Sequence, residues 1–137
     1  MPQPTLMVKE YLASAMEAIK TDAAVIALLG GPFVFLHVPE KQPKPLITVR
    51  VGAANDWSTK TEDGFTVTLT MVYWVKERGD TALYDLFTAV YGVLHQNKLI
   101  LANGQTVVSR WQSFTPVTDS DGLTYYAVDT YTAQLSN

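Results

Sequence analysis

Two hydrophobic periodicities meet in the middle of the chain, between Gly64 and Asn97. In residues 65–75, apolar and aromatic side chains alternate with threonine and valine, and this period of two predicts a long β-strand. From residue 83 the period changes, because apolar side chains recur at three- and four-residue spacing and so form one face of a helix. These positions are Leu83, Leu86, Phe87, Val90, Tyr91 and Leu94. A strand followed at once by an amphipathic helix predicts a helix lying across one face of a sheet.

The residues that flank this helix indicate where it begins and ends. Gly79 lets the chain turn, and Asp80 stands where an N-cap side chain belongs. Asn97 can close the far end in the left-handed conformation. We therefore expect the helix between Asp80 and Asn97.

The N-terminal part predicts two further helices. Thr5 can cap the first, whose apolar positions between residues 8 and 19 follow helical spacing. Thr21 and Asp22 offer a fresh cap for the short run 23–29, which Gly30-Gly31-Pro32 ends.

Strands and loops follow in the next part of the chain. Residues 33–38 and 46–51 read as short strands, separated by the loop 39–45 with its three prolines. Residues 52–63 are polar and show no period, so we expect a long exposed loop that joins two strands.

The C-terminal part predicts a hairpin and a closing strand. Asn103-Gly104 lies between apolar runs, which is a strong hairpin signal, and residues 106–117 form the return strand. We expect a bend there, because Pro116 cannot donate a hydrogen bond to a ladder. Residues 119–122 are a turn, and residues 123–135 alternate as the last strand.

Hairpin strands combined with amphipathic helices predict an α+β fold with a mainly antiparallel sheet and helices packed on one face. A chain of 137 residues suits a single domain, 1–137. Bulky residues occupy both faces of the central and last strands, so the second face also needs cover. The bent hairpin or a neighbouring subunit can supply it, and the pattern therefore indicates oligomerisation.

Composition excludes several classes of protein. There is no cysteine, which excludes disulfides and thiolate sites, and the net charge of −3 gives no basic surface for reading duplex DNA. No apolar run approaches the ~18–20 residues of a membrane span. The N-terminal residues do not resemble a signal peptide, so we expect synthesis and folding in the cytoplasm.

The sequence offers little for catalysis or metal binding. His37 and His95 are not spaced as metal ligands, no serine has a nucleophile-elbow frame, and the glycines form no phosphate-binding motif. Asp119 and Asp121 read as a turn, since the remaining ligands of a calcium loop are missing. We expect no catalytic residue, no cofactor and no metal.

One tryptophan stands apart from the predicted core. Trp57 lies in the polar 52–63 loop, and a large apolar side chain rimmed by polar groups is typical of a binding anchor. The alternative is a plain disordered loop. The candidate interface residues are Asn55, Asp56, Trp57, Ser58 and Lys60.

The order of elements carries a family resemblance. The segments are TDAAVIALLGGPFVF, KPLITVRVG, ALYDLFTAVYGVLHQNKLIL and DGLTYYAVDTYTAQL, with an Asn-Gly hairpin before the last. This order resembles the tail completion (tail terminator) proteins of long-tailed bacteriophages, prophages and gene transfer agents. The resemblance covers nearly the whole chain, but the family pattern has no counterpart for the 52–63 loop.

The resemblance implies a structural protein of the virion tail, assembled in the host cytoplasm. Such proteins form a hexameric ring on the head-proximal end of the tail tube, where they contact the major tail tube protein and the head-tail connector protein. DNA passes through the lumen without being read. No enzymatic activity is implied.

Two alternatives remain open at this point. A head-closure or neck protein would share this composition. A small soluble enzyme or ligand-binding domain would need a pocket, which Tyr73, Trp111 and Tyr126 could line.

Overall fold

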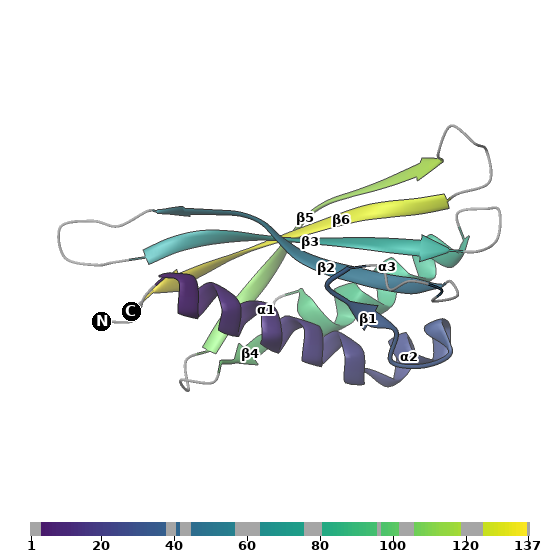
Figure 1. The fold of residues 1–137 in the computed structure, drawn as a ribbon, viewed down its shortest axis with the longest axis horizontal. Helices are drawn as coiled ribbons and strands as arrows, with labels where there is room; N and C mark the ends of the chain where they lie inside the picture. Colours follow the sequence, from purple (N-terminus) through teal and green to yellow (C-terminus); the bar gives the residue numbers. More distant parts are fainter. Residues whose placement is uncertain are drawn as a thin grey trace.

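The computed structural model describes residues 4–37, 41, 45–56, 64–75, 81–95, 97–101, 106–118 and 125–136. It confirms an α+β fold in one domain, with helices beside a mostly antiparallel sheet (Figure 1). In chain order the elements are α1 (Pro4–Thr21), α2 (Ala23–Leu29), β1 (Val34–Phe35), β2 (Leu46–Asp56), β3 (Gly64–Val75), α3 (Thr81–Leu94), β4 (Lys98–Ile100), β5 (Thr106–Thr118) and β6 (Tyr125–Ser136).

The six strands form one sheet in the order β1-β2-β3-β6-β5-β4. Only the short β1–β2 pair is parallel, and the other pairs are antiparallel. Figure 1 shows the twisted sheet with all three helices on one side of it. The hairpin predicted across Asn103-Gly104 exists as the β4–β5 pair, although the turn itself lies outside the described residues.

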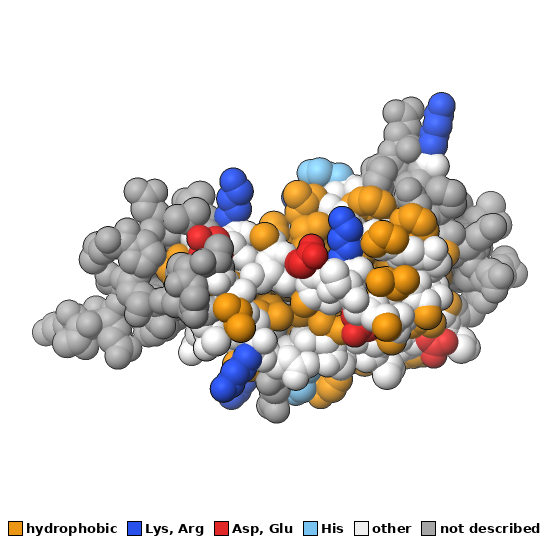
Figure 2. All heavy atoms as spheres, turned by 90° about the horizontal axis from the view of Figure 1, so that it is seen from below, with side chains coloured by type: hydrophobic (Ala, Val, Ile, Leu, Met, Phe, Trp, Pro, Cys, Tyr) orange, Lys and Arg blue, Asp and Glu red, His pale blue; other side chains and the backbone are white. Residues whose placement is uncertain are grey.

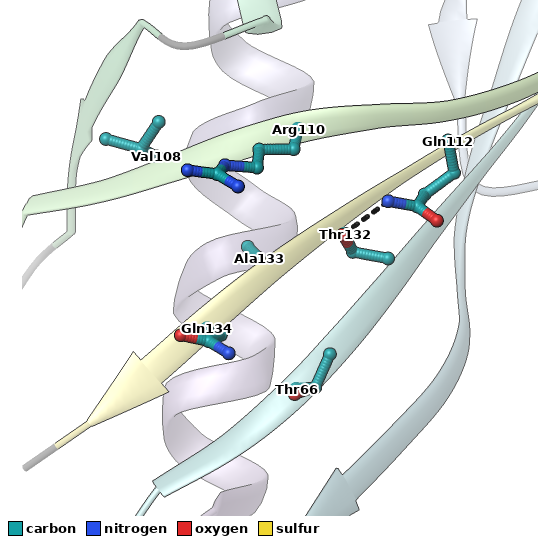
Figure 3. Close-up of a pocket in the computed structure, with 7 residues that line it drawn as sticks. All are labelled: Thr66, Val108, Arg110, Gln112, Thr132, Ala133 and Gln134. Carbon is teal, nitrogen blue, oxygen red and sulfur yellow. Dashed lines mark hydrogen bonds between the residues drawn. The ribbon is translucent and has the colours of Figure 1, made fainter.

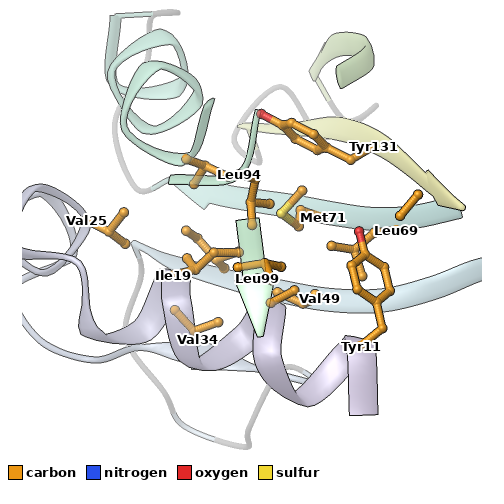
Figure 4. Packing of buried hydrophobic residues seen from close by; sticks show 14 of the residues in the cluster. Tyr11, Ile19, Val25, Val34, Val49, Leu69, Met71, Leu94, Leu99 and Tyr131 are labelled. Carbon is orange, nitrogen blue, oxygen red and sulfur yellow. The ribbon is translucent and has the colours of Figure 1, made fainter. Parts of the chain in front are cut away.

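The period of two in β3 separates a helix-facing side from an outer side. The buried side chains of β3 lie under the helices (Figure 4). They pack there with alternate residues of β6 and with the inner faces of α1 and α3. The buried residues of β3 are Val67, Leu69, Met71, Tyr73 and Val75. Within the same layer, the hydroxyls of Tyr11 in α1 and Ser109 in β5 are hydrogen-bonded at 2.6 Å, and burial raises the pKa of Tyr11 to about 12.

The ends of the helices are formed partly as predicted. Asp22 caps α2 by accepting a hydrogen bond from the Val25 N–H at 3.2 Å, and Gly30 ends it in the left-handed conformation at φ 80°. Asn97 acts differently from the prediction, because its backbone is not left-handed. Its side-chain amide instead donates to the carbonyls of Gly92 and Val93, at 2.6 and 2.9 Å, near the end of α3. Asp80 lies outside the described residues.

The loop predicted for residues 52–63 starts later in the structure than at residue 52. β2 continues to Asp56, and its register with β3 shifts between Val51 and Ala53. Gly52 lies at this shift, where a Cβ atom would stand 2.7 Å from the Thr70 hydroxyl oxygen. Ala53, Ala54 and Asn55, which follow it, are small or polar and exposed, so no burial imposes a hydrophobic period on them. Residues 57–63 lie outside the described part of the chain.

Two further strand predictions need correction. The first strand is shorter than predicted, and covers Val34–Phe35 where residues 33–38 were expected. The irregularity in β5 occurs between Trp111 and Ser113, while Pro116 stays in register opposite Ala127. None of the helices among the described residues is long and apolar enough to cross a membrane.

Replacing Leu86 with aspartate should unfold the protein. Leu86 is buried on the inner side of α3, so the variant places an uncompensated charge in the core at a cost of several kcal/mol. Thermal denaturation measures the effect, with Thr88→Asp on the exposed side of the same helix as the control. An unchanged melting temperature for Leu86→Asp would show that this face of α3 is not in the core.

Candidate interface

A buried carboxylate lies in the middle of β6. Asp129 is fully buried, and its two carboxylate oxygens accept hydrogen bonds from the Tyr73 hydroxyl and from the Trp111 indole N–H, the latter at 3.0 Å. Burial raises the pKa of Asp129 to about 7, and these hydrogen bonds oppose that shift because they favour the charged form. The carboxylate thus joins three strands, β3, β6 and β5, beneath α3.

Trp111 is held from two directions. Asp129 holds its indole, and its backbone N–H donates to His95 Nδ1 at 3.1 Å, just before the register shift in β5. The side chain is nevertheless 37% exposed, so a fixed indole ring meets the surface beside α3. A rigid aromatic side chain loses little entropy when a partner covers it.

Further aromatic rings surround Trp111 in the layer between α3 and β5. Phe87 stacks on Phe114 at 4.5 Å and lies 5.5 Å from Trp111, while Tyr91 stacks on His95 at 4.4 Å. Tyr84 approaches Phe114 at 5.5 Å and is 48% exposed. We refer to these six side chains as the aromatic cluster: Tyr84, Phe87, Tyr91, His95, Trp111 and Phe114. Exposed aromatic residues grouped in this way are typical of protein–protein interfaces.

The outer side of the sheet, which no described helix covers, has a different character. At one end the rings of Trp74 and Tyr126 lie 5.2 Å apart, and the Trp74 indole donates to the Thr48 hydroxyl at 3.3 Å. Further along, a groove of about 570 Å³ runs over β3, β6 and β5. Figure 3 shows Arg110 and Gln112 projecting into it from β5, with Gln112 donating to the Thr132 hydroxyl at 3.2 Å.

Comparison with known proteins identifies the family. The sequence model of the family described as "Tail completion protein gp17" matches residues 15–135. The chain belongs to this family of tail completion proteins. It is therefore a structural component of a phage tail.

A solved structure shares the fold of this tail completion protein. It comes from the "Virion of native gene transfer agent (GTA) particle" and superposes with a TM-score of 0.81, covering 95% of this chain and 97% of that chain at 19% identity. A search of curated proteins found no significant match.

The predicted interface residues of this tail completion protein lie at the far end of β2. Asn55 is exposed and pairs opposite Thr66, and Asp56 is the last residue of the strand. Trp57, Ser58 and Lys60 lie outside the described residues, so their role remains a prediction.

The aromatic cluster was not predicted from the sequence. Tyr91 belongs to the apolar face predicted for its helix, but it is 38% exposed, and Trp111, considered above only as a pocket residue, is 37% exposed. A usable signal existed, because α3 contains only one charged residue in fourteen. A solvent-facing helix side normally carries more charge than this.

Tyr73, Trp111 and Tyr126 do not line a common pocket of the kind that a small enzyme would need. Tyr73 and Trp111 meet at Asp129 on the helix side of the sheet, whereas Tyr126 lies on the outer side against Trp74. His37 is exposed after β1. The described residues contain no group of three or more potential metal ligands from His, Cys, Asp and Glu.

The buried carboxylate predicts an unusual dependence of stability on pH. Because the pKa of Asp129 is raised by folding, the native state binds more protons than the unfolded state between about pH 4 and pH 7. The stabilisation that this bound proton gives the native state is therefore fully present below pH 4 and is lost as pH rises through 7. In Asp129→Asn the amide oxygen can accept from Trp111 and the amide N–H can donate to Tyr73, so the network survives without a charge.

We expect the free energy of unfolding of Asp129→Asn, relative to the unchanged protein, to increase by about 1 kcal/mol or more between pH 4 and pH 8. Chemical denaturation at several pH values measures this difference. A difference that stays constant across the range would show that Asp129 titrates normally.

Proposed function

We propose that this tail completion protein forms a closed ring, most simply a hexamer, on the head-proximal end of the tail tube. The ring stops tube polymerisation and presents the surface to which the head-tail connector binds. The observation that carries the proposal is the family match over residues 15–135. Exposed aromatic side chains in the α3–β5 layer support it, because such side chains favour contact with other proteins.

Symmetry supports a ring over an isolated plug. The end of a tube is a ring of identical subunits, so a cap that contacts every subunit equally follows the same rotation. Contacts between free copies can be too small to hold at micromolar concentration, in which case the ring closes only on the tube. DNA passes through the lumen, and the net charge of −3 agrees with a channel that does not bind it tightly.

Electron microscopy of particles assembled without this protein tests the proposal. We expect tubes of uncontrolled length, and heads that remain separate from tails. Supplying the protein in trans should restore joined particles. Tails of normal length beside heads that lose their DNA would contradict the proposal, because that defect belongs to a head-closure protein.

The end of β2 and the residues that follow it are proposed to contact the tube, the connector or the next copy. Trp57 is the expected anchor, supported by Asn55, Asp56, Ser58 and Lys60. Trp57→Ala should leave the melting temperature nearly unchanged but lower the yield of joined, infectious particles, while Trp57→Phe should retain most of the yield. A large fall in melting temperature would place Trp57 in the core, and a normal yield would remove it from the interface.

A further inference from the structure

The exposed side of α2 and α3 is almost free of charge. The seven residues of α2 contain no charged side chain and the fourteen of α3 contain one, Asp85, whereas α1 carries two lysines and two glutamates. In Figure 2, apolar side chains gather on the half of the molecule that carries α2, with few charged side chains among them. Helices with so little charge on their outer side are typically covered in an assembly.

These exposed positions form one surface, because α2 packs on α3 and α3 packs on β5. We call it the helix surface, defined by Leu28 in α2, by Tyr84, Asp85 and Tyr91 in α3, and by Trp111 in β5. All five side chains are exposed, and the exposed alanines of α2 adjoin Leu28. The only charge within it is the acidic group of Asp85, which has no partner among the described residues.

The outer side of the sheet has the opposite charge. Its described charged residues are Arg50, Arg110 and, on the edge strand β4, Lys98, all three exposed and without an ion-pair partner in the described part of the chain. Threonines surround the two arginines, paired across the strands as Thr70 with Thr130 and Thr68 with Thr132. We call this the arginine surface. It includes the groove of about 570 Å³ beside Arg110.

We infer that the helix surface of one copy packs on the arginine surface of the next copy around the ring. This inference rests on the proposed ring. A ring of more than two identical subunits needs a head-to-tail contact between two different surfaces of each subunit. Here one surface carries only an acid and the other only bases, and they lie on opposite sides of the sheet. Arginine also stacks on the faces of tyrosine and tryptophan, so Arg110 fits an aromatic partner as well as Asp85.

Charge reversal tests the pairing of the two surfaces. Asp85→Arg and Arg110→Asp should each lower the number of tube ends that carry a closed ring by about tenfold or more, because each leaves like charges facing one another. Combining both substitutions in one chain restores opposite charges at every contact, and should recover most of the rings. Both residues are exposed, so the melting temperatures should stay unchanged.

Glu17→Arg is the matched control, since it makes the same change of charge at an exposed position of α1 outside both surfaces. It should leave ring formation intact.

If the double variant forms no more rings than the single variants, the pairing is wrong. If Asp85→Arg alone blocks assembly while Arg110→Asp does not, the helix surface contacts a different protein, which also overturns the inference. In either case rings of the unchanged protein on tube ends would leave the proposed function standing, whereas their absence would contradict that function.

Discussion

The antiparallel pairing of β3 with β6 is the constraint on which the rest of the structure depends. The two strands pair along their whole length, from Gly64 opposite Ser136 to Val75 opposite Tyr125. A strand sends alternate side chains to opposite faces, so this single register decides which residues meet the helices and which meet the outside. A slip by one residue would bring the threonines of β3 into the core and expose its leucine, methionine and tyrosine. The hydrophobic effect therefore fixes the register, and the register fixes both surfaces of the subunit.

The same register places Asp129 in the core, where an ionisable group is costly unless it is hydrogen-bonded. Tyr73 and Trp111 satisfy both of its oxygens, and in return the carboxylate fixes an indole that reaches the surface. The buried Asp129 and the aromatic cluster are thus directly linked, because Asp129 holds the indole of Trp111 in place. A surface anchored in this way is already ordered before a partner arrives, which lowers the cost of assembly.

Much of the fold could be predicted from the sequence, because the alternation in β3 and the helical spacing in α3 are imposed by burial. Predictions failed where burial imposes no period. Residues 53–55 of β2 are exposed, so their strand character leaves no hydrophobic pattern. The register shift after Trp111 lies beside a hydrogen bond to His95, a contact between two elements that no local pattern indicates. The aromatic cluster was missed for a related reason. Its members come from α3, from His95 directly after it and from β5. Only the tertiary structure shows that Tyr84, Tyr91 and Trp111 share a surface.

Among the described residues, the outer side of the sheet carries only basic charges, and the exposed side of α2 and α3 carries only the acidic Asp85. Two such different surfaces suit a protein that contacts its own copies in sequence around an axis. Cryo-electron microscopy of the native particle at the head–tail junction tests this most directly. We expect one closed six-fold ring of this fold between the last ring of the tail tube and the head connector. One or two copies at that position, or a ring of this fold elsewhere in the particle, would contradict it.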